Sequence, residues 1–156
     1  MDLDICDIIN LIVLIESSFA GIGKSGLFAR KISASFSSVG IPSFFCVPAQ
    51  ALHGDMGQIE KKDILVVFSY SGNTTELTSI LKYANRFNIK IIGVASKPDS
   101  TLIKASDIKI LIPSVKEADP TGMVPTSSTS ITLLLGDSLA VALMNKIKFS
   151  KERFKV

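Results

Sequence analysis

The 156-residue chain has no tryptophan, one histidine and two cysteines. The scarcity of cysteine and of histidine limits the disulfides and the metal sites that the chain can form. Two cysteines, Cys6 and Cys46, cannot build the disulfide framework of a small secreted domain. We therefore expect two reduced thiols in a cytoplasmic protein. The single histidine, His53, cannot define a metal site alone, and the nearby Cys46 lies within a predicted strand, so we expect no metal site.

Runs of like charge and long apolar runs are also missing. The 17 basic and 14 acidic residues are scattered, which gives little support for binding to nucleic acid or to a membrane surface. The longest apolar stretch, residues 5–15, is interrupted by Asp7 and Asn10, whereas a bilayer span needs about 20 residues. It follows Asp2 and Asp4, not the basic flank of a signal peptide. We expect neither nucleic acid nor a membrane as a partner.

The composition is that of a globular domain with its own core. Hydrophobic residues make up 47% of the chain and charged residues 20%, and no internal repeat or linker divides it. We expect one globular unit, in which residues 1–20 form an N-terminal helix and an irregular lead-in to a domain at 21–156. The segment Glu16–Ser18 is a poor β segment, so the strand that supports Gly21 is expected to be irregular.

Helical patterns alternate with short apolar runs along the chain. The expected helices cover residues 3–15, 24–38, 75–87, 100–105 and 126–146. The clearest expected strands cover residues 43–47, 63–68, 89–95 and 108–112. Strands separated by helices pair in parallel, so the pattern predicts an α/β fold, a doubly wound and mostly parallel five-stranded sheet flanked by helices. The last helix is apolar nearly all round, which is typical of a helix in the core or at a subunit interface.

The first glycine-rich loop precedes the second predicted helix and reads Gly21-Ile22-Gly23-Lys24-Ser25-Gly26. This is the dinucleotide-binding spacing, but the next predicted strand ends Cys46-Val47-Pro48, without the acid that holds the ribose. A P-loop would need glycine at position 18, where serine stands. What remains is a glycine turn at a helix N-terminus, either purely structural or, with Lys24, suited to one phosphate or another anion.

A second polar loop, residues 69–74, follows the most apolar predicted strand. Its hydroxyls at Ser69, Ser71 and Thr74, with the free backbone N–H groups of the following helix, form a neutral cradle for phosphate. Ordinary helix capping is the alternative, but a cap needs only one hydroxyl. In a parallel sheet, ligands bind beyond the carboxyl ends of the strands, so this loop, the glycine turn and the loops 47–55 and 113–125 are expected around the site.

Three further ionisable residues lie in or beside these loops. His53 could serve as an acid, base or hydrogen-bond donor, or it could be a solvated loop residue. Glu76 is either a first-turn acid favoured by the helix dipole or a group that transfers protons in catalysis. Glu117 is either a solvated loop charge or a second carboxylate that transfers protons.

Five segments in order carry a resemblance to a known family: Gly-Ile-Gly-Lys-Ser, Pro-Ala-Gln-Ala-Leu-His-Gly-Asp, Ser-Tyr-Ser-Gly-Asn-Thr-Thr-Glu-Leu, Lys-Glu-Ala-Asp-Pro and Val-Pro-Thr-Ser-Ser-Thr. Over residues 21–154 the chain resembles the sugar isomerase (SIS) domain, and more narrowly the arabinose-5-phosphate isomerase group. The resemblance implies a flavodoxin-like fold and an aldose–ketose isomerase that works through an enediolate without a cofactor. It would interconvert D-ribulose 5-phosphate and D-arabinose 5-phosphate for the 3-deoxy-octulosonate sugar of lipopolysaccharide.

The resemblance also implies roles for individual residues. The expected catalytic residues are Lys24, Glu76 and Glu117, and either glutamate could be the base. The expected substrate-binding residues are Gly40, Ile41, His53, Ser69, Ser71 and Thr74. The sugar phosphate is the expected small-molecule partner, and a homodimer or homotetramer is expected, with the apolar last helix suited to its interface.

The chain also departs from the family pattern. A further functional histidine of the family, in a Ser-His-Pro-Gly-Gly stretch, would begin just past Val156, and the paired CBS domains that usually follow are absent. Val47 and Gln50 replace a histidine and a glutamate of the family, which removes a potential metal ligand. Three hypotheses follow: an active isomerase completed by a partner subunit or another residue, a sugar-phosphate-binding module without catalysis, or a truncated remnant.

Overall fold

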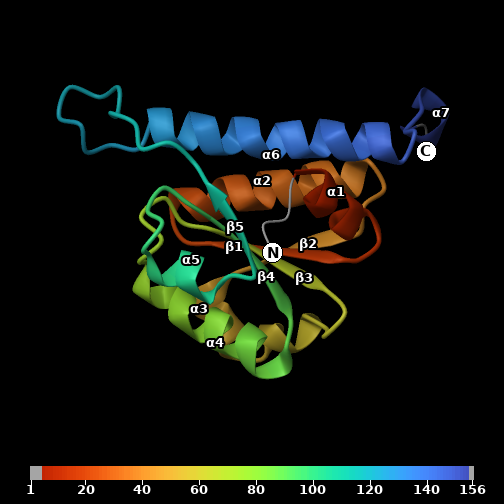
Figure 1. The fold of residues 1–156 in the computed structure, drawn as a ribbon, viewed down its shortest axis with the longest axis horizontal. Helices are drawn as coiled ribbons and strands as arrows, with labels where there is room; N and C mark the ends of the chain where they lie inside the picture. Colours follow the sequence, from red (N-terminus) through yellow and green to blue (C-terminus); the bar gives the residue numbers. More distant parts are fainter. Residues whose placement is uncertain (1–4, 155–156) are drawn as a thin grey trace.

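A computed structural model describes residues 5–154 of the chain (Figure 1). The helices are α1 (Ile5–Val13), α2 (Lys24–Ser38), α3 (Pro48–Ala51), η1 (Asp55–Gln58), η2 (Thr75–Leu77), α4 (Thr78–Phe87), α5 (Thr101–Ala105), α6 (Ser127–Lys146) and α7 (Lys151–Phe154). The strands are β1 (Ser17–Gly21), β2 (Ser43–Cys46), β3 (Ile64–Phe68), β4 (Lys90–Ala95) and β5 (Ile108–Leu111). The expected helix over 75–87 begins with the 3-10 turn η2 before the α-helical part.

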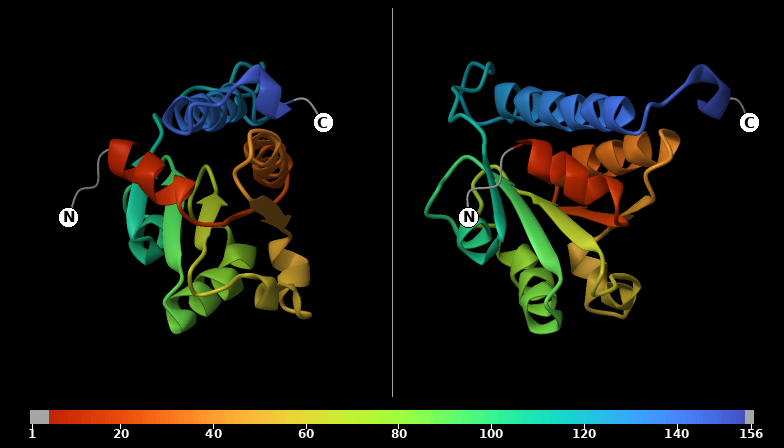
Figure 2. Two further views of the ribbon diagram at one scale, coloured as in Figure 1. Left: turned by 90° about the vertical axis from the view of Figure 1, so that its right-hand side faces the viewer. Right: turned by 45° about the vertical axis from the view of Figure 1, so that its right-hand side comes forward.

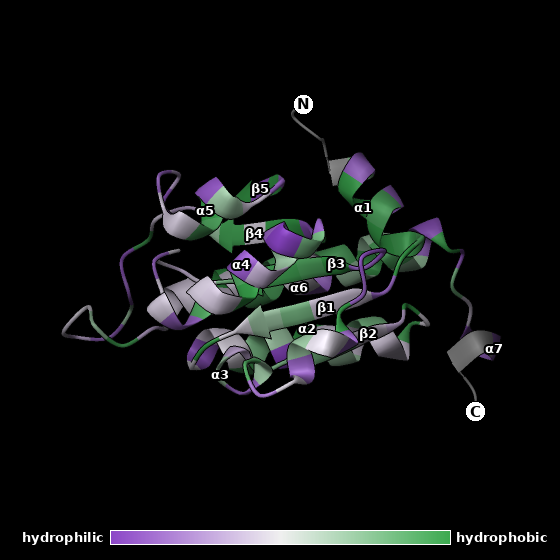
Figure 3. Cartoon of the chain, turned by 90° about the horizontal axis from the view of Figure 1, so that it is seen from below, coloured by the Kyte–Doolittle hydropathy of each residue, from purple (hydrophilic) through white to green (hydrophobic). Residues whose placement is uncertain are grey.

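All five strands are parallel and lie in the order β2-β1-β3-β4-β5. This confirms the predicted doubly wound α/β fold, and the order is that of flavodoxin-like sheets. Helices α1 and α2 cover one face of the sheet, with α6 packed outside them, and α3, α4 and α5 cover the other face (Figure 2). Each face has its own apolar cluster, one around Phe19, Ile32 and Leu143, the other around Leu65 and Ile80. Strand β3 is hydrophobic along its length, and β4 is buried throughout after its first residue, Lys90 (Figure 3).

The strand β1 departs from the expectation of an irregular lead-in. All five residues of Ser17–Gly21 are buried, and they pair in regular register with both β2 and β3, so the predicted irregularity is wrong. The hydroxyl of Ser18 donates to the carbonyl of Ile64 over 3.3 Å, which satisfies one buried polar group. Burial between two partner strands outweighs the low β propensity of serine. β1 also crosses the expected boundary at residue 20.

The long helix α6 is covered on one side only. Its buried residues face α1 and α2, and a Cβ at Gly136 would overlap the side chain of Ile32, so glycine allows close approach of the two helices. On the outer side, Leu134 is 67% exposed and Val141 is 56% exposed. By length and composition alone α6 could cross a membrane, a test that core helices also pass, and 33% of its apolar window is buried here.

Candidate functional site

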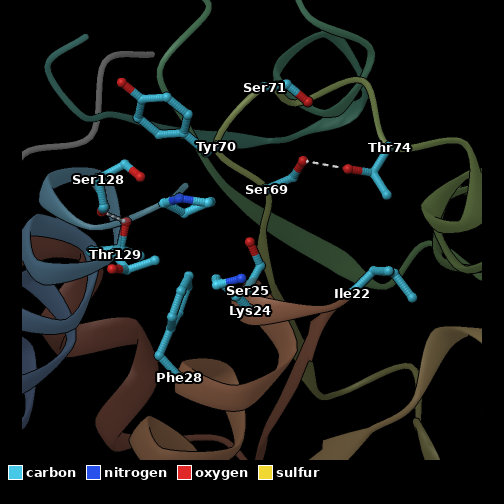
Figure 4. Close-up of a pocket in the computed structure, with 12 residues that line it drawn as sticks. Ile22, Lys24, Ser25, Phe28, Ser69, Tyr70, Ser71, Thr74, Ser128 and Thr129 are labelled. Carbon is cyan, nitrogen blue, oxygen red and sulfur yellow. Dashed lines mark hydrogen bonds between the residues drawn. The ribbon is translucent and has the colours of Figure 1, made fainter. Parts of the chain in front are cut away.

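A cavity of about 400 Å³ lies at the carboxyl ends of β1 and β3 (Figure 4). This is the switch point of the sheet, where the chain order changes direction and where ligands of such folds bind. Three segments form the walls, namely the start of α2, the loop after β3 and the start of α6. The lining residues are Ile22, Lys24, Ser25, Phe28, Ser69, Tyr70, Ser71, Thr74, Pro125, Ser128, Thr129 and Thr132.

The glycine turn brings Lys24 to the cavity. A Cβ at Gly21 would lie 2.8 Å from the carbonyl carbon of Ser25, and a Cβ at Gly26 would lie 2.8 Å from the carbonyl oxygen of Gly21. The two glycines therefore let the end of β1 touch the first turn of α2, while Gly23 has a φ of 58°. Lys24 is the first residue of α2, and among the lining residues given above it alone is charged. A single cation in a cavity of hydroxyls suits an anionic ligand.

The Ser69–Thr74 loop is held by its own side chains. The hydroxyls of Ser69 and Thr74 lie 2.9 Å apart (Figure 4). The N–H of Gly72 donates to the Ser69 hydroxyl over 3.1 Å. The N–H of Asn73 donates to the Ser71 hydroxyl over 3.2 Å. Ser69, Ser71 and Thr74 all line the cavity, immediately before the helical turn η2. The first N–H groups of such a turn have no acceptor within the helix, so the loop offers donors to an anion.

The start of α6 is capped by the carboxylate of Glu117 and not by the hydroxyls of residues 126–128. The Glu117 carboxylate accepts the N–H groups of Thr126 over 2.7 Å and of Ser128 over 3.2 Å. It also accepts the hydroxyl of Thr126 over 3.1 Å and, at short range, that of Ser128. The Ser128 hydroxyl and then the Thr126 N–H are the main causes that lower the pKa of Glu117 to about 2. Glu117 itself is not among the lining residues, and it meets the cavity through Ser128.

This lowered pKa predicts an acid-sensitive stability. The folded-state pKa lies below the ordinary value of 4.5, so the stabilisation is present above that value and is lost as pH falls toward about 2. The free energy of unfolding should therefore fall less steeply in Glu117→Gln than in the wild type between about pH 6 and pH 3. Urea denaturation at several pH values across this range measures the free energy of unfolding. Glu16→Gln, a change at an exposed carboxylate, should keep the wild-type slope, and equal slopes for wild type and Glu117→Gln would contradict the prediction.

Four predicted site residues lie away from the cavity wall. Glu76 lies in η2 and His53 between α3 and η1, and both side chains are exposed. Gly40 and Ile41 lie between α2 and β2, at the amino end of β2, whereas the cavity lies at the carboxyl ends of the strands. Ile41 is buried in the core. Within one chain the structure thus brings together Lys24 and the three loop hydroxyls, but not these four residues. Their roles stay predictions.

The sequence reasoning missed Tyr70 and the hydroxyls of α6. The N–H of Val115 donates to the Tyr70 hydroxyl over 3.0 Å, and this hydroxyl lies 3.3 Å from the carbonyl of Val115, so the cavity wall is tied to the loop before α6. Ser128, Thr129 and Thr132 line the cavity from one face of α6. Their spacing of one and four residues places them on one side of a helix, which is the signal that could have found them.

Neither cysteine lies on the cavity wall, and no metal centre forms among the residues that the structure describes. No group of three His, Cys, Asp or Glu side chains within residues 5–154 is placed to hold a metal ion. Cys46 is buried, and burial, with the nearby Asp55 charge as a smaller cause, raises the pKa of its thiol to about 11. This thiol therefore stays protonated at neutral pH.

Comparison with known protein families identifies one match. The family described as SIS domain matches residues 18–142. Proteins named arabinose 5-phosphate isomerase KdsD are 44% identical to this chain in Pseudomonas aeruginosa and 41% identical in Escherichia coli K12. Both alignments cover 134 residues, which is 86% of this chain but only 41% of each relative. The chain thus spans less than half the length of these relatives.

Comparison with solved structures gives the same fold. The structure of the Escherichia coli CFT073 protein c3406, described as a complex with arabinose 5-phosphate, superposes with a TM-score of 0.91 and 34% identity. The match covers 96% of this chain and 80% of that chain.

Proposed function

Because this chain belongs to the SIS domain family, we propose that it is an aldose–ketose isomerase of sugar phosphates. The proposed reaction interconverts D-ribulose 5-phosphate and D-arabinose 5-phosphate in the cytoplasm, where the product would supply the 3-deoxy-octulosonate sugar of lipopolysaccharide. One observation carries the proposal: Lys24 and the Ser69–Thr74 loop line one cavity at the switch point of the sheet. The names of the KdsD relatives and the arabinose 5-phosphate in the c3406 structure support this substrate class.

The cavity offers two kinds of group to a sugar phosphate. The Ser69–Thr74 loop and the N-terminal turn behind it provide hydroxyl and N–H donors, which bind a phosphate without needing a positive charge. The Lys24 ammonium lies on the neighbouring wall and is free to face the carbonyl end of the sugar. We place the phosphate on the loop and the reacting carbons toward Lys24.

The reaction moves one proton between neighbouring carbons. A base removes a proton from C1 of ribulose 5-phosphate, and the electron pair forms the C1–C2 double bond of an enediolate with negative charge on O2. Lys24 stabilises this developing oxyanion. Return of the carbon-bound proton to C2 and transfer of the O1 proton to O2 give the aldehyde and the C2 hydroxyl of arabinose 5-phosphate, so that no external oxidant is needed.

Of the two glutamates, Glu76 is the better candidate base. Its carboxylate is exposed and has no hydrogen-bond partner among residues 5–154, whereas both oxygens of Glu117 accept hydrogen bonds. A base needs a free lone pair for the proton, and the Glu117 carboxylate, whose pKa is lowered to about 2, has little tendency to take one up.

We further propose that the site is completed in a homodimer or homotetramer. Glu76, His53, Gly40 and Ile41 lie outside the cavity of their own chain, and the outer face of α6 exposes Leu134 and Val141. A second copy packed on such a face would bury this apolar surface and bring distant groups to the cavity. Light scattering of the purified chain measures the assembly.

A non-catalytic sugar-phosphate-binding module is the second candidate. It is favoured by the positions of Glu76 and His53, since neither faces the cavity within one chain. Such a module needs the phosphate loop but no base. It should bind arabinose 5-phosphate without converting it.

Turnover separates the two candidates. The purified chain is given D-ribulose 5-phosphate and the appearance of D-arabinose 5-phosphate is followed by NMR. An isomerase should form the product, and Glu76→Gln should stop it while Glu16→Gln, a matched change at an exposed carboxylate, should not. A folded chain that binds the sugar phosphate but leaves it unchanged would exclude the isomerase and leave the binding module.

A further inference from the structure

Three residues of α6 that line the cavity carry hydroxyl groups, and the hydrogen-bond partner of each hydroxyl shows where its hydrogen points. The Ser128 hydroxyl contacts the Glu117 carboxylate, which when ionised can only accept, so Ser128 donates. The Thr129 hydroxyl donates to the carbonyl of Thr126 over 2.7 Å, and the Thr132 hydroxyl donates to the carbonyl of Ser128 over 2.8 Å. Each hydroxyl has one hydrogen, so all three retain only acceptor lone pairs for a ligand.

Ser128, Thr129 and Thr132 line one side of the cavity, and their hydroxyl groups can offer a ligand there only hydrogen-bond acceptors. Figure 4 places Ser128 and Thr129 on the α6 side and Lys24 on the neighbouring α2 wall. A phosphate bears only acceptor oxygens when ionised, so it would be repelled by these acceptors, whereas the hydroxyl groups of a sugar are donors to them. The acceptor wall of Ser128, Thr129 and Thr132 therefore matches the polyol part of a sugar phosphate.

We infer that Glu117 is a positioning residue that makes the first turn of α6 an acceptor wall for the sugar's hydroxyl groups. The inference rests on the proposed sugar-phosphate ligand and adds a role to the same site. Glu117 holds the turn by four hydrogen bonds to Thr126 and Ser128, and it fixes the Ser128 hydrogen away from the ligand. Ser128 itself is only 2% exposed, so its hydroxyl has little freedom to turn.

The same hydrogen bonds argue against proton transfer by Glu117. Its oxygens are occupied by donors, and the lowered pKa of about 2 keeps the carboxylate ionised. An amide at this position would present an N–H₂ group to donors and would free the Ser128 hydroxyl to rotate. The structure thus assigns to Glu117 an effect on ligand affinity.

The test compares Ser128→Ala with the matched control Ser130→Ala. The Ser130 hydroxyl also donates to the carbonyl of Thr126, over 3.0 Å, but Ser130 is exposed and is not among the lining residues. Calorimetry measures the Kd of each variant for arabinose 5-phosphate and, separately, for inorganic phosphate. Ser128→Ala should weaken arabinose 5-phosphate binding about 3- to 10-fold and leave phosphate binding unchanged, as one lost hydrogen bond predicts. Ser130→Ala should change neither.

Variants at Thr129 and Glu117 keep the inference testable if Ser128→Ala folds poorly. Thr129→Val should weaken arabinose 5-phosphate binding by a similar factor, and Thr129→Ser, which retains the hydroxyl, should restore it. Glu117→Gln should raise the Kd for the sugar phosphate about tenfold, and the double variant with Ser128→Ala should be no weaker than its weaker parent. An affinity unchanged in Glu117→Gln, with a loss in kcat alone, would overturn the positioning role and indicate proton transfer.

The outcomes also separate this inference from the proposed function. Binding of arabinose 5-phosphate without turnover would end the isomerase proposal while the variants still test the acceptor wall. Turnover by the wild type, with equal affinities in Ser128→Ala, Thr129→Val and Ser130→Ala, would overturn the acceptor wall and leave the isomerase. Equal losses for arabinose 5-phosphate and inorganic phosphate would place the phosphate on α6 and would also overturn it.

Discussion

Replacing Lys24 by methionine should lower kcat/KM for D-ribulose 5-phosphate by about 100- to 1000-fold, the range found when one group that stabilises an oxyanion is removed. Methionine keeps most of the length and the apolar stem of lysine but carries no charge. Since Lys24 alone is charged among the residues that line the cavity, no neighbouring lining residue can replace it. Initial rates with the purified variant measure the effect.

Lys82→Met is the matched control for this experiment. Lys82 is exposed on α4, on the other face of the sheet, and its loss should leave kcat/KM within about twofold of the wild type, as for surface changes away from a site. If Lys24→Met retained more than a tenth of the wild-type value, Lys24 would not stabilise the transition state.

Replacing Gly72 by alanine should disable the phosphate loop and destabilise the chain. Gly72 has a φ of 68°, and a Cβ there would overlap the side chain of Ser100, which is itself buried. The strain and the overlap together should cost about 1–3 kcal/mol in the free energy of unfolding. Because the Gly72 N–H also donates to Ser69, the shifted loop should lose measurable affinity for arabinose 5-phosphate.

Gly57→Ala provides the comparison. Gly57 lies in η1, and a Cβ there would meet no atom within 4 Å. Urea denaturation and calorimetry of both variants should show the losses at Gly72 alone. Equal stabilities and equal affinities for the two variants would mean that the loop tolerates a side chain at Gly72, against this account.

The fold could be predicted largely because its strands have local signatures. The strand at 64–68 is a continuous apolar run, and α2 ends near Gly40 and Pro42, so these boundaries depend on the sequence beside them. β1 could not be predicted in this way. Its burial comes from β2 and β3, which lie far along the chain, and this burial overrides the serines of Ser17–Gly21.

In the candidate site too, the features with a local sequence signal could be predicted, and those that depend on distant contacts could not. The hydroxyls of the Ser69–Thr74 loop could be predicted because the loop directly follows a clear apolar strand, and Lys24 could be predicted because it stands in a glycine turn at the start of a helix. The capping of α6 by Glu117 could not be predicted, because the hydroxyls next to a helix are its ordinary caps. A carboxylate nine residues before Thr126 reaches the N–H groups at the start of α6 only once the loop between them has folded back.

We propose that the cavity between Lys24 and the Ser69–Thr74 loop holds a sugar phosphate. A crystal structure of this chain with arabinose 5-phosphate tests it most directly. We expect phosphate oxygens within about 3 Å of the hydroxyls of Ser69, Ser71 or Thr74, the usual hydrogen-bond range, with sugar hydroxyls facing Ser128 and Thr129. A sugar phosphate bound elsewhere while this cavity holds only water, or a phosphate seated against α6, would contradict the account.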